Sequence, residues 1–258
     1  MSYQTLFLQQ SYRDCTKQYE EILHNPNLPL WDYVVLTASN EAQAQAYRAQ
    51  ISYRLKHQML PEKTHYAVLP DPDGKRVGSG GATLNVLRYI REHAASKQSL
   101  AAVPHGAVQG DGAVESRQLA SAQPGEAACH AFDGKRILVI HSGGDSKRVP
   151  QYSACGKLFS PVPRILPNGR RSTLFDEFMI AMCGVAARMN AGMLVCSGDV
   201  LLLFNPLQID FYGKGAAALS IKEPAEIGKN HGVYRRDREG NVGGFLHKKT
   251  VEQLHEMG

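Results

Sequence analysis

The stretch Arg136-Ile-Leu-Val-Ile-His-Ser-Gly-Gly-Asp-Ser-Lys-Arg-Val-Pro150 decides how the rest of the chain is arranged. Its first half, Ile137 to Ile140, is an apolar, β-branched run, which is typical of a strand buried on both faces. The residues from Ser142 to Ser146 leave the backbone accessible, and the cations Lys147 and Arg148 follow. Backbone N–H groups in such a loop face an anion and the cations offset its charge, so the stretch predicts a phosphate site. A tight turn with solvated cations explains the loop alone equally well.

The composition is that of an ordinary globular protein. The chain has 258 residues, of which 43% are hydrophobic and 21% charged, so one large α/β domain and two small domains are both possible. The net charge of +5 is mild and the basic residues form no long run, which argues against a nucleic-acid partner. A local anionic ligand explains this small surplus of positive charge just as well.

The cysteines and the apolar segments indicate a cytoplasmic protein. The five cysteines form no Cys-x-x-Cys pair, so we expect reduced thiols and neither a disulfide framework nor a zinc site. We find no basic region followed by an apolar core at the N-terminus, and no apolar run near the ~20 residues of a membrane span. We therefore expect no signal peptide and no association with membranes.

Helical and strand patterns alternate along the chain, which predicts an α/β fold with a mainly parallel sheet covered by helices. We expect helices over residues 5–24, from Asn40 to about His57, after residues 78–83, and over 173–190. We expect strands over residues 32–37, 66–69, 137–140, 192–197 and 217–222, and a hairpin formed by 233–234 and 244–247. Residues 96–134 are rich in Ala, Gly, Ser and Gln, which predicts a long low-complexity insertion within a single domain spanning residues 1–258.

Four loops are expected to meet at the carboxyl edge of this sheet, where ligands of parallel sheets bind. They are residues 38–40, 78–83, 142–148 and 197–200. The last contains Asp199, directly after an apolar strand and a small Ser-Gly pair. A carboxylate at that point is placed to hold Mg²⁺, and Mg²⁺ bridges phosphate oxygens. The alternative is an Asp that caps the next turn.

The glycines Gly78, Gly80 and Gly81 form a second small-residue loop that opens a helix. They allow close approach of the backbone to an anion or a nucleobase. The loop is neither a dinucleotide-binding fingerprint, because Thr83 stands in place of the third glycine, nor a Walker loop, because no Gly-Lys-Ser/Thr closes it. A flexible turn into a helix is the alternative.

Arg148 and Lys157 suit phosphoryl or nucleotidyl transfer, which needs in-line positioning and neutralisation of charge. Arginine grips two phosphate oxygens as a planar fork, whereas lysine acts as a compact point charge. His141 and His231 are better explained as packed or hydrogen-bonded histidines than as catalytic groups. We find no Ser-His-Asp order and no zinc-type histidine cluster in the sequence.

These motifs resemble the fucokinase/fucose-1-phosphate guanylyltransferase family. The phosphate-loop part, Ser142-Gly-Gly-Asp-Ser-Lys-Arg148 with Gly156-Lys157, is similar to the signature of sugar-1-phosphate nucleotidylyltransferases. The other matching parts are Trp31–Ser39, Val77–Thr83, Ile137–Pro150, Cys196–Asp199 and His231–Tyr234. The resemblance implies a GT-A-like Rossmann domain that joins a nucleoside triphosphate, expected to be GTP, to L-fucose 1-phosphate, releasing pyrophosphate with Mg²⁺ assisting.

The resemblance also implies roles for particular residues. Gly143, Gly144 and Ser146 would lie along the nucleotide phosphates, and Arg148 and Lys157 would stabilise charge at the α-phosphate and the leaving pyrophosphate. Asp199 would bind Mg²⁺, Lys248 would meet the sugar phosphate, and Gly78, Gly80 and Gly81 would bound the base side of the pocket. Lys249 follows Lys248 where the family pattern has proline.

Family members continue well past Gly258, so the resemblance implies that the domain is incomplete at its C-terminus and that C-terminal domains of a larger protein are missing. A second acidic metal ligand is expected from a later strand, and we expect weak or no catalysis by this chain alone. Two alternatives stay open. One is part of an ATP-dependent fucokinase whose kinase domain is missing, since Gly78–Ala82 is a poor match to a sugar-kinase loop. The other is a non-catalytic nucleotide-binding module.

Overall fold

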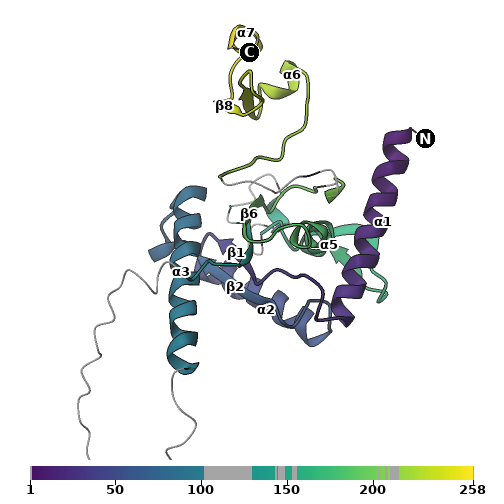
Figure 1. The fold of residues 1–258 in the computed structure, drawn as a ribbon, viewed down its shortest axis with the longest axis vertical. Helices are drawn as coiled ribbons and strands as arrows, with labels where there is room; N and C mark the ends of the chain where they lie inside the picture. Colours follow the sequence, from purple (N-terminus) through teal and green to yellow (C-terminus); the bar gives the residue numbers. More distant parts are fainter. Residues whose placement is uncertain are drawn as a thin grey trace, which may run out of the picture. The chain divides into compact units, whose positions relative to one another are not determined.

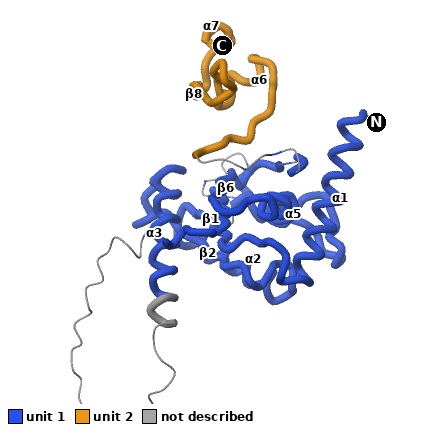
Figure 2. Tube along the Cα trace, viewed as in Figure 1, with its two compact units in different colours: residues 1–210 blue, residues 211–258 orange. Residues whose placement is uncertain are grey.

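The computed structural model describes residues 2–101, 130–142, 144, 149–152, 156–202, 204–206, 209 and 215–257. The chain falls into two compact units, Met1–Asp210 and Phe211–Gly258 (Figure 2). Each unit is considered by itself, and the prediction of one domain over residues 1–258 stays a prediction.

A parallel sheet forms the centre of the first unit. Among the described residues its strand order is β2-β1-β3-β6, with β1 (Tyr33–Ala38) paired to β2 (His65–Pro70) and to β3 (Arg136–His141), and β3 paired to β6 (Gly192–Ser197). The expected buried strand at the centre of the opening stretch is confirmed, because Ile137 to Ile140 are all buried. The chain leaves β1 toward β2 on one side and later returns to place β3 on the other. The connections that leave β1 and β3 therefore run to opposite sides, and such a switch point opens a crevice at the carboxyl ends of these two strands.

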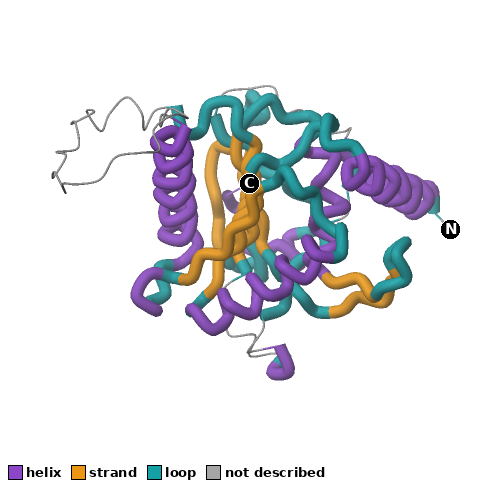
Figure 3. Tube along the Cα trace, turned by 90° about the horizontal axis from the view of Figure 1, so that it is seen from below, coloured by secondary structure: helices purple, strands orange, loops and turns teal. Residues whose placement is uncertain are grey.

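Helices cover both faces of this sheet (Figures 1 and 3). α3 (Gly78–Ala101) packs Val86 and Ile90 against Val35 and Val139 on one face. On the other side lie α2 (Glu41–Lys56) and α5 (Leu174–Ala186), and α1 (Tyr3–His24) packs against α5. The expected helices and parallel strands are thus confirmed, apart from small shifts at their ends.

Helix starts follow the expected capping chemistry. The side chain of Asn40 accepts a hydrogen bond from the Gln43 N–H at 2.9 Å, as predicted for the start of α2. The return bond differs from a capping box, because Gln43 Oε1 accepts from the Ser39 N–H at 2.8 Å and not from Asn40. At α5, Thr173 and Asp176 form a full capping box.

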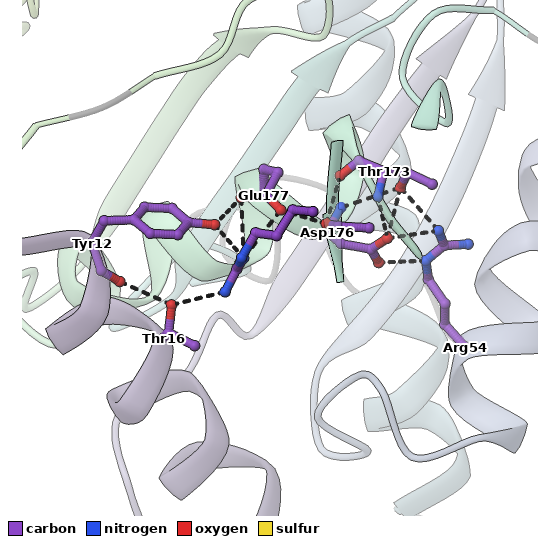
Figure 4. Close-up of polar contacts among 8 residues, drawn as sticks. Tyr12, Thr16, Arg54, Thr173, Asp176 and Glu177 are labelled. Atoms are coloured by element: carbon purple, nitrogen blue, oxygen red, sulfur yellow. Dashed lines mark hydrogen bonds and ion pairs between the residues drawn. The ribbon is translucent and has the colours of Figure 1, made fainter. Parts of the chain in front are cut away.

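A buried ion pair ties α2 to α5, and a hydrogen bond to a second carboxylate ties α1 to α5 (Figure 4). Arg54 donates to both carboxylate oxygens of Asp176, at 2.7 and 3.0 Å, and the two side chains are only 4% and 6% exposed. Arg164 pairs with Glu177 at 3.1 Å, and the hydroxyl groups of Tyr12 and Ser172 also donate to Glu177. Because bidentate pairs fix orientation as well as distance, these contacts set how the helices sit on the sheet.

The antiparallel pairs were only partly predicted. The expected hairpin in the second unit is confirmed as β7 (Gly232–Arg236) and β8 (Val242–His247), with α6 (Ala225–Gly228) and α7 (Val251–Met257) beside it in the chain. In the first unit, β4 (Pro161–Ile165) pairs with β5 (Arg171–Thr173), and short 3-10 turns occur at Pro72–Gly74 and Pro150–Tyr152.

Two expectations need correction. The predicted strand over residues 217–222 is not formed, and all of these residues are exposed, including Leu219 and Ile221. An apolar run becomes a strand only when another strand and a core take up its two faces. The predicted insertion at 96–134 begins later than expected, because α3 continues to Ala101. Residues 102–129 of that insertion lie outside the described residues.

Candidate functional site

A cavity of about 210 Å³ opens at the carboxyl edge of the parallel sheet. Thr37 and Ser39 border it from the end of β1, and His141 and Gly144 from the end of β3, so it lies at the switch point between these strands. Its remaining lining residues are Asp71, Arg76, Gly78, Ser79 and Ala82. The expected meeting of loops 38–40 and 78–83 with the residues after β3 is therefore confirmed for the described residues, of which Gly144 represents the loop 142–148.

The fourth loop, residues 197–200, lies against the same edge. The Gly198 N–H donates to the His141 carbonyl at 2.8 Å. A Cβ atom at position 198 would come within 2.9 Å of the Ser142 Cβ, closer than such atoms normally approach. Glycine at position 198 thus lets the end of β6 pack directly on the first residue of the phosphate loop.

His141 connects three elements at the floor of the cavity. Its Nδ1 lies 3.2 Å from the Thr37 hydroxyl, and its Nε2 lies 2.9 Å from the Thr83 hydroxyl. The Thr83 hydroxyl already donates to the Ser79 carbonyl, so it accepts from an Nε2–H of His141. Burial lowers the pKa of His141, which favours the neutral ring, with Nδ1 accepting from Thr37. The packed, hydrogen-bonded histidine expected from the sequence is confirmed.

The glycines of the second loop lie within the bounds of α3, so the loop is shorter than predicted and Gly80 and Gly81 belong to the first turn of the helix. Gly78 has φ +69°, which favours glycine. A Cβ at Gly81 would lie 2.7 Å from the Val77 Cβ, whereas nothing lies within 4 Å of one at Gly80. Gly78 and Ser79 border the cavity. The first N–H groups of a helix have no partner within the helix, so the start of α3 is suited to an anionic ligand.

Asp71 and Arg76 are cavity residues that the sequence reasoning missed. Burial raises the pKa of the Asp71 carboxyl, and the charge of Arg76 opposes this shift. The signal was present, because Asp71 follows the strand β2 as Asp199 follows β6. Applying the rule about carboxyl ends to every strand would have found it.

Lys157 and Asp199 lie together beside the phosphate loop. Lys157 Nζ is 3.3 Å from Asp199 Oδ2, and the Ser197 hydroxyl donates to Asp199 Oδ1 at 2.8 Å. The bond from Ser197, followed by the contact with Lys157, lowers the pKa of Asp199, so this carboxylate is ionised at neutral pH. The structure thus brings together two residues that were predicted for the same site, and their roles stay predictions.

Of the other predicted residues, only Gly144 and Lys248 are described by the structure. Gly144 borders the cavity, whereas Gly143, Ser146 and Arg148 lie outside the described residues. Lys248 belongs to the second unit, where it follows β8 with φ +48° and its N–H donates to the His231 carbonyl at 3.2 Å.

Asp199 is the residue that would hold a magnesium ion at this site. In the part of the chain that the structure describes, no group of three or more His, Cys, Asp or Glu residues could hold a metal. Mg²⁺ commonly uses one or two carboxylates together with substrate phosphates and water, so one exposed, ionised carboxylate beside a phosphate loop is compatible with it.

Among the described helices, none is long and apolar enough to cross a membrane.

Comparison with protein families gives one match. A family model described as the fucose pyrophosphorylase domain matches residues 130–258. This region begins just before β3 and contains the phosphate loop, Lys157, Asp199 and Lys248. No solved structure matches the chain at a significant level.

Characterised relatives match most of the chain. A bifunctional fucokinase/GDP-fucose pyrophosphorylase of Arabidopsis thaliana is 32% identical over 247 residues, covering 90% of this chain and 22% of the relative. A human fucose-1-phosphate guanylyltransferase is 31% identical over 241 residues, covering 88% of this chain and 33% of the relative. An L-fucokinase/L-fucose-1-P guanylyltransferase of Bacteroides fragilis is 25% identical, covering 76% of this chain and 18% of the relative. The chain thus spans at most about a third of the length of these relatives.

Proposed function

The chain belongs to the fucose pyrophosphorylase family, and on that premise we propose that it takes part in nucleotidyl transfer from a nucleoside triphosphate to a sugar 1-phosphate. The expected substrates are GTP and L-fucose 1-phosphate, and the expected products are GDP-fucose and pyrophosphate. The names of the relatives, GDP-fucose pyrophosphorylase and fucose-1-phosphate guanylyltransferase, support this choice of nucleotide and sugar.

The observation that carries the proposal is the arrangement at the carboxyl edge of the sheet. A cavity at the switch point is bordered by the start of α3 and by Gly144 of the phosphate loop, and the loop containing Asp199, paired with Lys157, packs against the same edge. Backbone N–H groups, a lysine and an ionised carboxylate are the groups that a metal-bound triphosphate needs. A core turn would not require them to meet at one edge.

In the proposed reaction a phosphate oxygen of the sugar 1-phosphate attacks the α-phosphorus of the nucleotide. The bond from the α-phosphorus to the bridging oxygen breaks, and pyrophosphate leaves with the electron pair. Lys157 and Arg148 stabilise the charge that builds on the α-phosphate and on pyrophosphate. The N–H groups of Gly143, Gly144 and Ser146 position the phosphates, and Lys248 meets the sugar phosphate.

The remaining predicted residues are assigned to the nucleotide base and to the metal. Gly78, Gly80 and Gly81 bound the base side of the pocket, where the absence of side chains admits a flat ring. Asp199 holds Mg²⁺, which supplies positive charge to the phosphate oxygens when it is bound. We also propose that the parallel sheet is the Rossmann-like core of a GT-A-type fold and that the chain works as part of a larger protein.

The proposal is tested by measuring pyrophosphate release from GTP and L-fucose 1-phosphate with Mg²⁺, in parallel with calorimetric titration of GTP into the chain. ATP and UTP are the controls for the base, and other sugar 1-phosphates are the controls for the sugar. GTP binding with pyrophosphate release supports the transferase. GTP binding without release supports a nucleotide-binding module. A chain that binds none of these nucleotides contradicts both.

A further inference from the structure

Tyr47 of α2 contacts both segments that carry the proposed phosphate site. Its hydroxyl donates to the Ser142 carbonyl at 3.2 Å, and Ser142 is the first residue of the phosphate loop. The same hydroxyl lies against the backbone of Gly156, the residue before Lys157. Tyr47 is fully buried, at 0% exposure. One buried side chain of an earlier helix therefore lies between the phosphate loop and the predicted lysine.

Position 156 requires glycine for two reasons. Its φ of +70° favours glycine, and a Cβ there would overlap the Tyr47 hydroxyl and come 2.9 Å from the ring carbon Cζ. No residue other than glycine fits without moving the tyrosine ring. The Tyr47 ring also packs against Phe159, with the ring centroids 5.2 Å apart, so Tyr47 contacts the chain on both sides of Lys157.

The contacts form a closed circuit that links Ser142, Tyr47, Lys157 and Asp199. Ser142 is held by Tyr47 on one side, and its own hydroxyl donates to the Thr37 carbonyl at 2.7 Å. Gly198 packs on Ser142, and the next residue, Asp199, pairs with Lys157. Lys157 follows Gly156 in the chain, and Gly156 lies against the Tyr47 hydroxyl. A shift of Tyr47 would therefore change the distance between the phosphate loop and the lysine.

We propose that Tyr47 is a positioning residue of the triphosphate site, whose hydroxyl fixes the spacing between Ser142, just after β3, and the segment Gly156-Lys157. This inference rests on the proposed function, because it assumes that the loop and Lys157 hold the same phosphates. Tyr47 acts through these two segments and does not itself contact the nucleotide. The alternative is a core tyrosine that contributes only to stability.

The test compares Tyr47→Phe with Tyr19→Phe. Each substitution removes one buried hydroxyl that donates to a backbone carbonyl, since the Tyr19 hydroxyl donates at 3.0 Å to the carbonyl of Met59, just past the C-terminal end of α2. Calorimetry gives the dissociation constants of Mg-GTP and of GMP for both variants and for the unmodified chain. We expect Tyr47→Phe to weaken GTP binding about fivefold, the equivalent of one hydrogen bond, with a smaller loss for GMP, which keeps only the α-phosphate. Tyr19→Phe should change neither constant.

A second variant makes the coupling explicit. In the Lys157→Ala variant, adding Tyr47→Phe should weaken GTP binding by less than the fivefold expected in the unmodified chain, because the lysine that Tyr47 positions is gone. If Tyr47→Phe does not fold, Gly156→Ala perturbs the same contact from the side of Gly156, because the added Cβ displaces the Tyr47 hydroxyl. Equal effects of Tyr47→Phe and Tyr19→Phe, or equal losses for GTP and GMP, would overturn the positioning role. An unmodified chain that binds GTP no better than GMP would instead remove the proposed function, and the positioning role with it.

Discussion

Lys157 Nζ lies 3.3 Å from Asp199 Oδ2, although 42 residues separate them along the chain. Their side chains are 33% and 53% exposed. Pairs with this much access to solvent contribute at most about 1 kcal/mol to stability, so stability alone gives little reason for the pairing. In this structure each residue offsets the charge of the other. Under the proposed function, phosphate oxygens would be a better partner for the lysine, and a cation a better partner for the carboxylate.

Lys157→Ala should abolish nucleotidyl transfer and weaken GTP binding at least tenfold, because a direct charge-assisted contact to phosphate contributes about 1.5–3 kcal/mol. The fold should be unaffected, with a loss of less than about 1 kcal/mol in the free energy of unfolding. Calorimetry and urea denaturation measure the two effects. Lys135→Ala is the matched control, because Lys135 also forms a half-exposed pair, with Asp32 at 3.7 Å, at the opposite end of β3. Unchanged turnover in Lys157→Ala would remove this residue from the site.

Asp199→Asn should make GTP binding insensitive to Mg²⁺. The amide keeps the size of the side chain and its contact with Ser197 but removes the charge that a cation requires. In the unmodified chain Mg²⁺ should tighten GTP binding, and in the variant titrations with Mg²⁺ and with EDTA should agree. A variant that keeps the full magnesium effect would show that the ion is held elsewhere.

Gly156→Ala should destabilise the protein by about 3 kcal/mol, of which about 1 kcal/mol comes from the positive φ and the rest from displacing Tyr47. Gly169→Ala provides the control, because Gly169 has φ +78° but nothing lies within 4 Å of the added Cβ. The control should lose only about 1 kcal/mol. Urea denaturation of both variants isolates the contribution of the Tyr47 contact, and equal losses would mean that the contact relaxes without cost.

The central elements of the fold were predictable because their signals are local. Ile137 to Ile140 form a continuous apolar run, and Asn40 caps α2, which begins at the next residue. The contacts that orient these elements were not predictable. The pair of Arg54 and Asp176 joins residues 122 positions apart, and no periodicity in either segment indicates the partner. The bond from Tyr47 to Ser142 escaped sequence reasoning for the same reason.

The candidate site shows the same division. Asp199 was predicted from its place after a strand and Lys157 as a cation nine residues past Arg148, and the two lie together in the structure. Asp71 was missed although it occupies the corresponding place after β2. The strand expected over residues 217–222 was wrong, because its apolar residues stay exposed, and an apolar pattern alone does not show whether a partner strand exists.

His141 predicts how stability depends on pH. Burial lowers its pKa below the ordinary value of 6.5, so between 6.5 and the lower folded value the unfolded chain binds more protons than the folded chain. The contribution of His141 to stability should therefore be complete above pH 6.5 and be lost as the pH falls below it. His141→Gln should flatten this part of the curve of unfolding free energy against pH. A variant whose stability falls as steeply as that of the unmodified chain would assign the dependence to other groups.

The central claim is that the carboxyl edge of the sheet, between β1 and β3, holds the nucleoside triphosphate. Hydrogen–deuterium exchange with and without Mg-GTP tests it most directly, because it reports backbone N–H groups one segment at a time. We predict slower exchange at the start of α3, in residues 142–148, and in the segments containing Lys157 and Asp199. Protection confined to the groove along the edge of β2, lined by Arg48, Lys56 and Tyr66, or no protection at saturating GTP, would contradict the claim.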